Sequence, residues 1–230
     1  MASNNKIERI PTGIPGLDKL VEGGFERHSS TLIMGGSGAG KSTLALQYLV
    51  SGAQDHDEPG IYITFDEKSD SVKRHMFNYG WDLEKLEEEN KFAFIEHSGQ
   101  QIKKLLDRGG GEIENKVEEL GAKRMVIDSL TTFALLFKDE IARRDTIIQL
   151  FRLLNSWETT SLLTSEVWSS SREAGRFSLD FLADGVIVIY NIQEEKERKR
   201  YLEVLKMRGT NHSMRLHPFI FNEKGISLKC

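Results

Sequence analysis

The feature that most constrains the fold of this 230-residue chain is a glycine-rich segment near its start. The segment Gly35–Ser42 reads GGSGAGKS, and it lies between an apolar run at Thr31–Met34 and a helical pattern at Ser42–Val50. The spacing G-x-x-x-x-G-K-[ST] between a strand and a helix is typical of a phosphate-binding loop. Glycines let backbone amides come close to an anion, and the amino end of a helix attracts negative charge. The segment therefore predicts a strand, a phosphate loop and a helix, in that order.

Each residue type in this segment has an expected role. The lysine, Lys41, would reach the β- and γ-phosphates of ATP or ADP, and the Ser42 hydroxyl is a hard oxygen ligand suited to Mg²⁺. The residues expected to surround the nucleotide phosphates are Gly36, Ser37, Gly38, Ala39, Gly40, Lys41, Ser42 and Thr43. The sequence thus predicts an ATP site with magnesium as its cofactor.

An acidic residue, Asp128, ends the apolar run Arg124–Ile127. In phosphate-loop proteins, an acid at the end of a buried strand holds the water shell of Mg²⁺. We therefore expect Asp128 to be the second magnesium residue beside Ser42. The alternative is that Asp128 only caps the following segment, Ser129–Thr132.

Two further acids, Asp66 and Glu67, follow the predicted strand Ile61–Phe65. Ligands collect at the carboxyl ends of the strands in open α/β sheets, so these acids should face the terminal phosphate. There, Glu67 could orient and deprotonate the attacking water, with Asp66 as the secondary candidate. The alternative is that both acids only favour the amino end of a helix beginning near Ser69.

Strand and helix patterns alternate along most of the chain. Strands are expected at Thr31–Met34, Ile61–Phe65, Phe92–Ile95, Met125–Ile127 and Leu162–Thr164, and helices at Ser42–Val50, Ser71–Tyr79, Ile113–Leu120 and Arg144–Trp157. Two hairpins should follow, Val186–Ile192 with Tyr201–Met207 around the charged tip Gln193–Arg200, and Phe219–Phe221 with Ile226–Leu228. This order predicts one α/β domain over residues 1–230, with a mainly parallel central sheet flanked by helices and antiparallel strands at its end.

Composition restricts the possible partners and compartment. The net charge of −4 provides no global positive field to attract nucleic acid, although one face could still be basic. The only cysteine is Cys230, and no Cys/His cluster offers a zinc site. The polar start Met1–Glu8 does not read as a secretion signal, and no apolar run is long enough to span a bilayer. We therefore expect a cytoplasmic protein without a membrane partner.

Four stretches together resemble one known family. They are Pro11–Gly24 (PTGIPGLDKLVEGG), the phosphate loop, Thr64–Glu67 (TFDE) and Leu205–His212 (LKMRGTNH). The pattern resembles the RecA superfamily and, within it, the KaiC family of ATPases. The first and last stretches are specific to that family, and the four are spread over nearly the whole chain.

The resemblance implies further site residues and an assembly. Glu67 and Asp66 fall where the family carries paired catalytic carboxylates, while Lys206 and Arg208 fall where it places residues that reach a neighbouring subunit's γ-phosphate. His212 falls where the family has a histidine near the neighbour's nucleotide. A homo-oligomeric ring, commonly a hexamer, with ATP at its interfaces is therefore implied. Spacing alone favours a plainer reading of Lys206 and Arg208, as exposed residues of an edge strand.

Other parts of the resemblance are weaker or absent. Ser165–Glu166 loosely matches the position of a polar phosphate sensor in RecA-like proteins. Asp180 and Phe181 stand where the clock protein of the family carries its phosphorylated Ser-Thr pair, so autophosphorylation is not expected. Two rival functions remain open: a RecA-like DNA recombination or remodelling ATPase, with Trp168–Phe177 and Gly109–Gly111 as candidate DNA loops, and a nucleotide-switched scaffold with little turnover.

Overall fold

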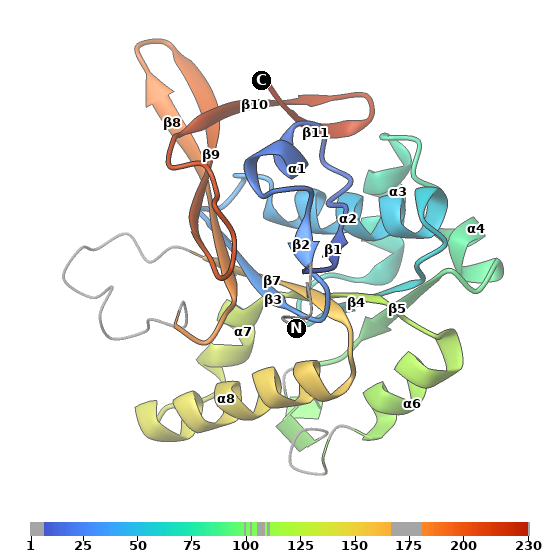
Figure 1. The fold of residues 1–230 in the computed structure, drawn as a ribbon. Coiled ribbons are helices and arrows are strands. Elements are labelled where there is room, and N and C mark those ends of the chain that lie inside the picture. The colour runs from blue at the N-terminus through green and yellow to red at the C-terminus, as the bar shows by residue number, and fades with distance from the viewer. Residues whose placement is uncertain are drawn as a thin grey trace, which may run out of the picture.

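The computed structural model describes residues 7–98, 100–101, 103–104, 109, 111–166 and 181–229 (Figure 1). Its strands are β1 (Arg9–Ile10), β2 (Phe25–Glu26), β3 (Ser30–Gly35), β4 (Gly60–Thr64), β5 (Phe92–Glu96), β6 (Arg124–Asp128), β7 (Thr160–Glu166), β8 (Gly185–Glu194), β9 (Glu197–Met207), β10 (His217–Asn222) and β11 (Gly225–Leu228). Its helices are α1 (Leu17–Leu20), α2 (Lys41–Asp55), α3 (Ser69–Phe77), α4 (Leu83–Glu88), α6 (Gly111–Leu120), α7 (Leu130–Leu135) and α8 (Glu140–Ser156).

Within the described residues, nine strands form the central sheet in the order β11-β10-β9-β8-β3-β7-β6-β4-β5. The strands from β8 to β5 in this order run parallel, whereas β9, β10 and β11 each pair antiparallel with their neighbours. The predicted fold class, a mainly parallel sheet extended by antiparallel strands, is confirmed. Strand β8 belongs to both parts, because it pairs with β3 on one side and with β9 on the other.

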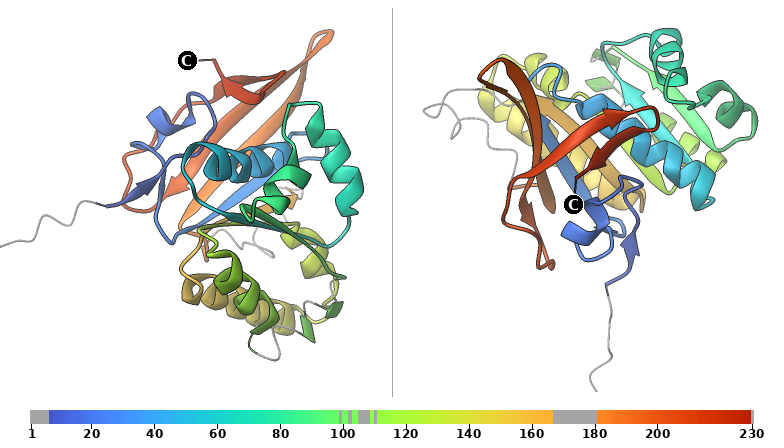
Figure 2. Two further views of the ribbon diagram at one scale, coloured as in Figure 1. Left: turned by 90° about the vertical axis from the view of Figure 1, so that its right-hand side faces the viewer. Right: turned by 90° about the horizontal axis from the view of Figure 1, so that it is seen from above.

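Helices cover both faces of the sheet (Figures 1 and 2). On one face, α2, α3 and α4 pack with the C-terminal hairpin β10–β11 around one apolar cluster, in which Leu44 and Leu46 are fully buried. On the other face, α6, α7 and α8 pack around a second cluster that includes Phe133 and Leu154. Parallel strands buried on both faces explain the continuous apolar runs seen in the sequence.

One helix begins before the apolar residues that predicted it, and several other elements are too short for their residues to show a periodic pattern. Helix α8 starts four residues before the expected Arg144, because the side chain of Asp139 accepts a hydrogen bond from the backbone N–H of Ala142 at 2.8 Å and caps the helix. The short helices α1, α4 and α7 and the two-stranded sheet β1–β2 were not expected. Elements of two to six residues do not complete a recognisable period.

The charged segment Gln193–Arg200 is not a long hairpin tip, and that part of the prediction is wrong. Strand pairing continues to the cross-strand pair Glu194 and Glu197, so only two residues turn. Both strands keep side chains that alternate between faces, and Arg200 pairs in register with Asn191. Arg200 therefore belongs to the sheet rather than to a solvated loop.

A buried ion pair fixes the end of the sheet opposite the phosphate loop. The side chain of Arg124, at the start of β6, is completely buried, and its Nε donates to Oε2 of Glu58 at 2.7 Å. Its Nη1 donates to the backbone carbonyl of Tyr48 in α2 at 2.8 Å. A methyl group at Gly52 of α2 would lie 2.4 Å from Arg124 Cδ, so this glycine lets the helix approach β6 closely.

Candidate functional site

The phosphate loop connects β3 to α2 and leaves open space above its backbone. Gly38 and Gly40 take φ values of 70° and 112°, which favour glycine. Among the described residues other than its two chain neighbours, a Cβ atom at Gly36 or Gly38 would meet no atom within 4 Å. Helix α2 begins at Lys41 with Gly40 as its N-cap and without a side-chain cap, so no capping side chain competes for its first-turn amides. The expected strand, loop and helix are all present.

The side chain of Lys41 folds back over the loop. Its Nζ donates to the carbonyl oxygens of Gly35 at 2.9 Å and Gly36 at 3.0 Å. Burial lowers the pKa of Lys41 from its ordinary value, and the carboxylates of Glu166 and Asp128 oppose this shift. The ammonium group thus lies among carbonyl and carboxylate oxygens above the loop.

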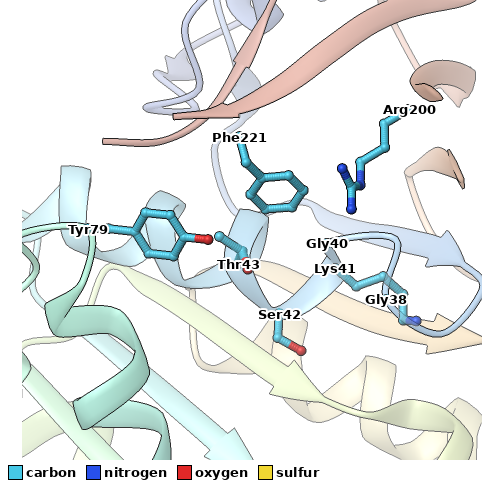
Figure 3. Close-up of a pocket in the computed structure, with 8 residues that line it drawn as sticks. All are labelled: Gly38, Gly40, Lys41, Ser42, Thr43, Tyr79, Arg200 and Phe221. Atoms are coloured by element: carbon cyan, nitrogen blue, oxygen red, sulfur yellow. The ribbon is translucent and has the colours of Figure 1, made fainter. Parts of the chain in front are cut away.

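A cavity of about 470 Å³ opens beside the loop and the start of α2. It is lined by Gly38, Gly40, Lys41, Ser42, Thr43, Tyr79, Arg200 and Phe221. The side chains of Tyr79, Phe221 and Arg200 come from elements far apart in the sequence and face the same cavity (Figure 3). Its volume lies in the range of small-molecule and cofactor sites.

The C-terminal hairpin is held over the loop by α2 itself. The buried side chain of Gln47 donates to the carbonyl of Ile226 at 2.9 Å and accepts from its backbone N–H at 2.6 Å. This anchor places the Phe221 ring over the loop so closely that a Cβ atom at Gly40 would lie 2.6 Å from Cζ of Phe221. A glycine at position 40 is therefore needed for this packing as well as for its backbone angle.

Arg200 is a cavity residue that sequence reasoning missed. Its guanidinium lies 4.8 Å from the centroid of the Phe221 ring, and its Nε is buried without a hydrogen-bond partner among the described residues. A buried donor without a partner is costly, so this atom fits a site whose ligand supplies an acceptor. In the sequence, the run of charges around Arg200 indicated a solvated segment. Tyr79 and Phe221 showed only the apolar spacing of a helix and a strand.

Asp128 is the last residue of β6, and each oxygen of its carboxylate accepts a hydrogen bond from a neighbouring strand. Its Oδ2 accepts from the Tyr62 hydroxyl at 2.5 Å, and its Oδ1 accepts from the Thr164 hydroxyl. Burial and the nearby Asp128 raise the pKa of Tyr62 well above its ordinary value, so the phenol keeps its proton. The capping alternative for Asp128 is wrong, since Ser129 is the N-cap of α7 and accepts from the backbone N–H of Thr132.

Asp66 and Glu67 follow β4 and lie exposed before α3, whose N-cap is Lys68. Their backbone N–H groups donate to the Thr64 hydroxyl at 3.4 and 3.2 Å. The Asp66 carboxylate accepts from the hydroxyl of Thr132 in α7.

Lys206 and Arg208 lie at the opposite end of the sheet from their own phosphate loop. Met207, between them, pairs with Gly185, which in turn pairs with Thr31 at the start of β3. At about 3.3 Å per residue, the start and end of β3 differ by roughly 13 Å along the strand. Lys206 Nζ donates to the carbonyl of Ala183 at 2.7 Å. The structure therefore does not bring this pair to the loop of the same chain.

Arg208 and His212 have local partners. The Arg208 guanidinium donates to Asp184 Oδ1 and to the carbonyl of Phe181, both at 3.1 Å. His212 Nδ1 lies 3.1 Å from the carbonyl oxygen of Ser213. Arg208 is more than half exposed, with 56% of its side chain accessible. These contacts leave the guanidinium at the surface, where a second chain could reach it.

The last expected positions are on and after β7. Glu166 pairs in register with Gly35 at the start of the loop, and its backbone N–H donates to the Thr131 hydroxyl at 2.8 Å. Ser165 is buried beside Thr131. The candidate DNA loop Trp168–Phe177 and Asp180 lie outside the described residues, as does Gly110 within Gly109–Gly111.

The donor set at the sheet edge suits magnesium bound together with phosphate. Among the described residues, no group of three or more histidine, cysteine or acidic side chains could hold a metal by itself. Mg²⁺ is commonly held by one or two protein oxygens together with substrate phosphates and water. Ser42 at the start of α2 and Asp128 at the end of β6 provide such oxygens.

Among the described helices, none is long and apolar enough to cross a membrane.

Comparison with known sequences gives a consistent set of relatives. A family model described as "ATPase: KaiC" matches residues 10–229. A UPF0273 protein of Methanocaldococcus jannaschii is 34% identical, with 96% of this chain and 96% of that protein covered. The circadian clock oscillator protein KaiC of Prochlorococcus marinus is 36% identical over 96% of this chain and 45% of its own length. The chain thus spans about half the length of that clock protein.

A solved structure matches the fold over almost its full length. The crystal structure of a KaiC-like protein from Pyrococcus horikoshii superposes with a TM-score of 0.87 at 36% sequence identity. The match covers 98% of this chain and 100% of the other. The arrangement of strands described above is therefore that of a single KaiC-like unit.

Proposed function

The chain belongs to the KaiC family of ATPases in the RecA superfamily, and on this premise we propose that it binds ATP·Mg²⁺ beside α2 and hydrolyses it. One observation carries the proposal. An open glycine loop with its lysine, and the carboxylates at the ends of β4 and β6, meet at one edge of the sheet. Parallel strands bring ligand-binding residues together at this edge.

Binding would use the loop and the cavity together. The phosphates would lie over Gly36–Ser42, where backbone amides and the amino end of α2 face open space. Lys41 would exchange its carbonyl contacts for phosphate oxygens, which are stronger charge-assisted acceptors. The base and ribose would lie toward Tyr79, Phe221 and Arg200, where a nucleotide could supply an acceptor for Arg200 Nε, which has no partner in the described part of the chain.

Hydrolysis would need a water oriented for in-line attack on the γ-phosphate. Glu67 is the better candidate for the base, because Asp66 is already engaged by Thr132. Magnesium, when bound, neutralises developing charge on the phosphate oxygens. Ser42 and Asp128 would hold it, and Lys41 would add a fixed positive charge.

The site would be completed by another copy of the chain. Lys206 and Arg208 lie at the far end of their own sheet, so they can serve a nucleotide only across an interface. We propose that the protein forms a ring in which these residues and His212 face the neighbour's phosphates, with the hexamer as the size implied by its family. A trans arginine can contribute roughly 10³–10⁵ in rate.

Mixing two defective variants tests this sharing. Arg208→Ala chains keep Glu67, and Glu67→Gln chains keep Arg208, so mixed rings contain some interfaces with both groups. Activity should then exceed that of either variant alone, with light scattering used to verify that mixed rings form. Mixed rings as inactive as their parents, or a fully active monomer, would rule out the shared site.

Phosphate release by the wild-type protein tests hydrolysis itself. Steady turnover that depends on Mg²⁺ and falls by a factor on the order of 10² in Glu67→Gln would support the proposal. Nucleotide binding without turnover would favour the scaffold function.

Single-stranded DNA should leave the rate of phosphate release unchanged, because the chain has a net charge of −4. Strong stimulation of that rate by DNA would favour the DNA-remodelling function.

A further inference from the structure

The hydroxyl of Tyr62 contacts one of the two residues expected to hold magnesium. Tyr62 is in the middle of β4 and only 1% exposed. Its hydroxyl donates to Oδ2 of Asp128 at 2.5 Å. No sequence motif indicated this contact.

The direction of this hydrogen bond follows from the chemistry of the groups. An ionised carboxylate can only accept, so the single proton of Tyr62 is committed to Asp128. The phenol therefore fixes one oxygen of the carboxylate that is expected to hold the metal.

A second donor limits how Asp128 can turn. Thr164, from β7 on the other side of β6, donates to Oδ1. With one hydroxyl on each oxygen, the carboxylate plane is fixed, and its remaining lone pairs point in a set direction.

We propose that Tyr62 is a positioning residue of the Mg²⁺ site, which orients the Asp128 carboxylate toward the metal. This inference rests on the proposed function, since it assumes that Ser42 and Asp128 hold Mg²⁺ with ATP. Outer-shell partners of metal ligands typically contribute 10–100-fold to metal affinity. Tyr62→Phe, which removes only the hydroxyl, should therefore raise the half-saturating Mg²⁺ concentration by about 10-fold or more.

Another buried tyrosine provides a matched control. Tyr48 is fully buried in α2, and its hydroxyl donates to the backbone carbonyl of Thr160 at 3.0 Å, at the other end of the sheet. Tyr48→Phe also loses one buried hydroxyl and one hydrogen bond. If Tyr62 were only a core residue, the two phenylalanine variants would differ in stability alone and would have the same magnesium dependence.

The test is calorimetric titration with the non-hydrolysable analogue AMP-PNP over a series of Mg²⁺ concentrations. The variants are Tyr62→Phe, Tyr62→Leu as a second way to remove the hydroxyl, Thr164→Val and the control Tyr48→Phe. We expect both Tyr62 variants to bind the Mg²⁺-free analogue as the wild type does, and to need about 10-fold more Mg²⁺ for full affinity. Thr164→Val should show a shift in the same direction, and Tyr48→Phe none.

The outcomes separate this inference from the proposed function. Folded Tyr62 variants with the wild-type Mg²⁺ dependence would overturn the positioning role while leaving nucleotide binding intact. An equal shift in Tyr48→Phe would overturn it too, because the effect would then be general loosening of the core. A wild-type protein whose AMP-PNP affinity did not respond to Mg²⁺ would overturn the proposed metal site and this inference together.

Discussion

Removal of the Glu58 carboxylate should destabilise the fold far more than loss of an ordinary surface charge. The Arg124 side chain has no solvent exposure, and its Nε and Nη2 lie 2.7 and 2.6 Å from the same Glu58 oxygen. In Glu58→Ala the guanidinium would keep the Tyr48 carbonyl and the Tyr48 ring, 4.5 Å from its centre, but no counter-charge. Arginine cannot escape the cost by deprotonating.

The size of the effect follows from this burial. Breaking a buried pair by removal of one partner costs about 3–5 kcal/mol. For a chain of this size, each kcal/mol lowers Tm by about 2–4 °C, so the expected fall is roughly 6–20 °C. The surface pair Lys85–Glu89 offers a control, because its atoms are 3.8 Å apart and its side chains are 67% and 44% exposed. Glu89→Ala should cost at most about 0.5 kcal/mol.

Urea and thermal unfolding followed by circular dichroism measure both variants. Adding Arg124→Met to Glu58→Ala should recover much of the lost stability, since an apolar side chain has no charge to leave unpaired. A loss below about 1 kcal/mol in Glu58→Ala would refute the reasoning, because it would mean that water compensates the buried guanidinium. A double variant less stable than the single one would refute it as well.

Two further predictions concern the nucleotide site. Asp66→Asn should lower phosphate release less than Glu67→Gln does, because Thr132 already holds the Asp66 carboxylate; the reverse order would assign the attacking water to Asp66. Phe221→Ala should weaken ATP binding by about 1–3 kcal/mol if the base stacks on this ring, whereas Ile220→Ala, on the opposite face of β10, should leave the affinity unchanged in the same titration.

The sequence was most informative where the chemistry is local. The glycines, Lys41 and Ser42 form one continuous segment, so spacing alone placed the loop between its strand and helix. Asp128 and the pair after β4 could be brought to the same edge because parallel strands end on one side. The alternation of apolar and polar residues predicted the hairpins, but it did not predict how long their strands are.

Residues contributed by the packing of distant elements could not be predicted in this way. Arg200 looked like part of a solvated charge run, because nothing local reveals that β9 continues beside the cavity. Tyr62 looked like one apolar position of a buried strand, since the contact with Asp128 depends on the pairing of β4 with β6. Both roles depend on how the strands are aligned, and this alignment cannot be read from the sequence.

The most direct test of the central claim, that the phosphate loop binds ATP, is a titration of a fluorescent ATP analogue into the wild type and Lys41→Ala. Lys41 is only partly buried, and within the described ranges its Nζ bonds to loop carbonyls, so the variant should fold normally, which circular dichroism can verify. The account expects saturable, Mg²⁺-dependent binding to the wild type and binding at least about 10-fold weaker in the variant, since a charge-assisted contact to phosphate is lost. Undiminished affinity in a folded Lys41→Ala protein would contradict it.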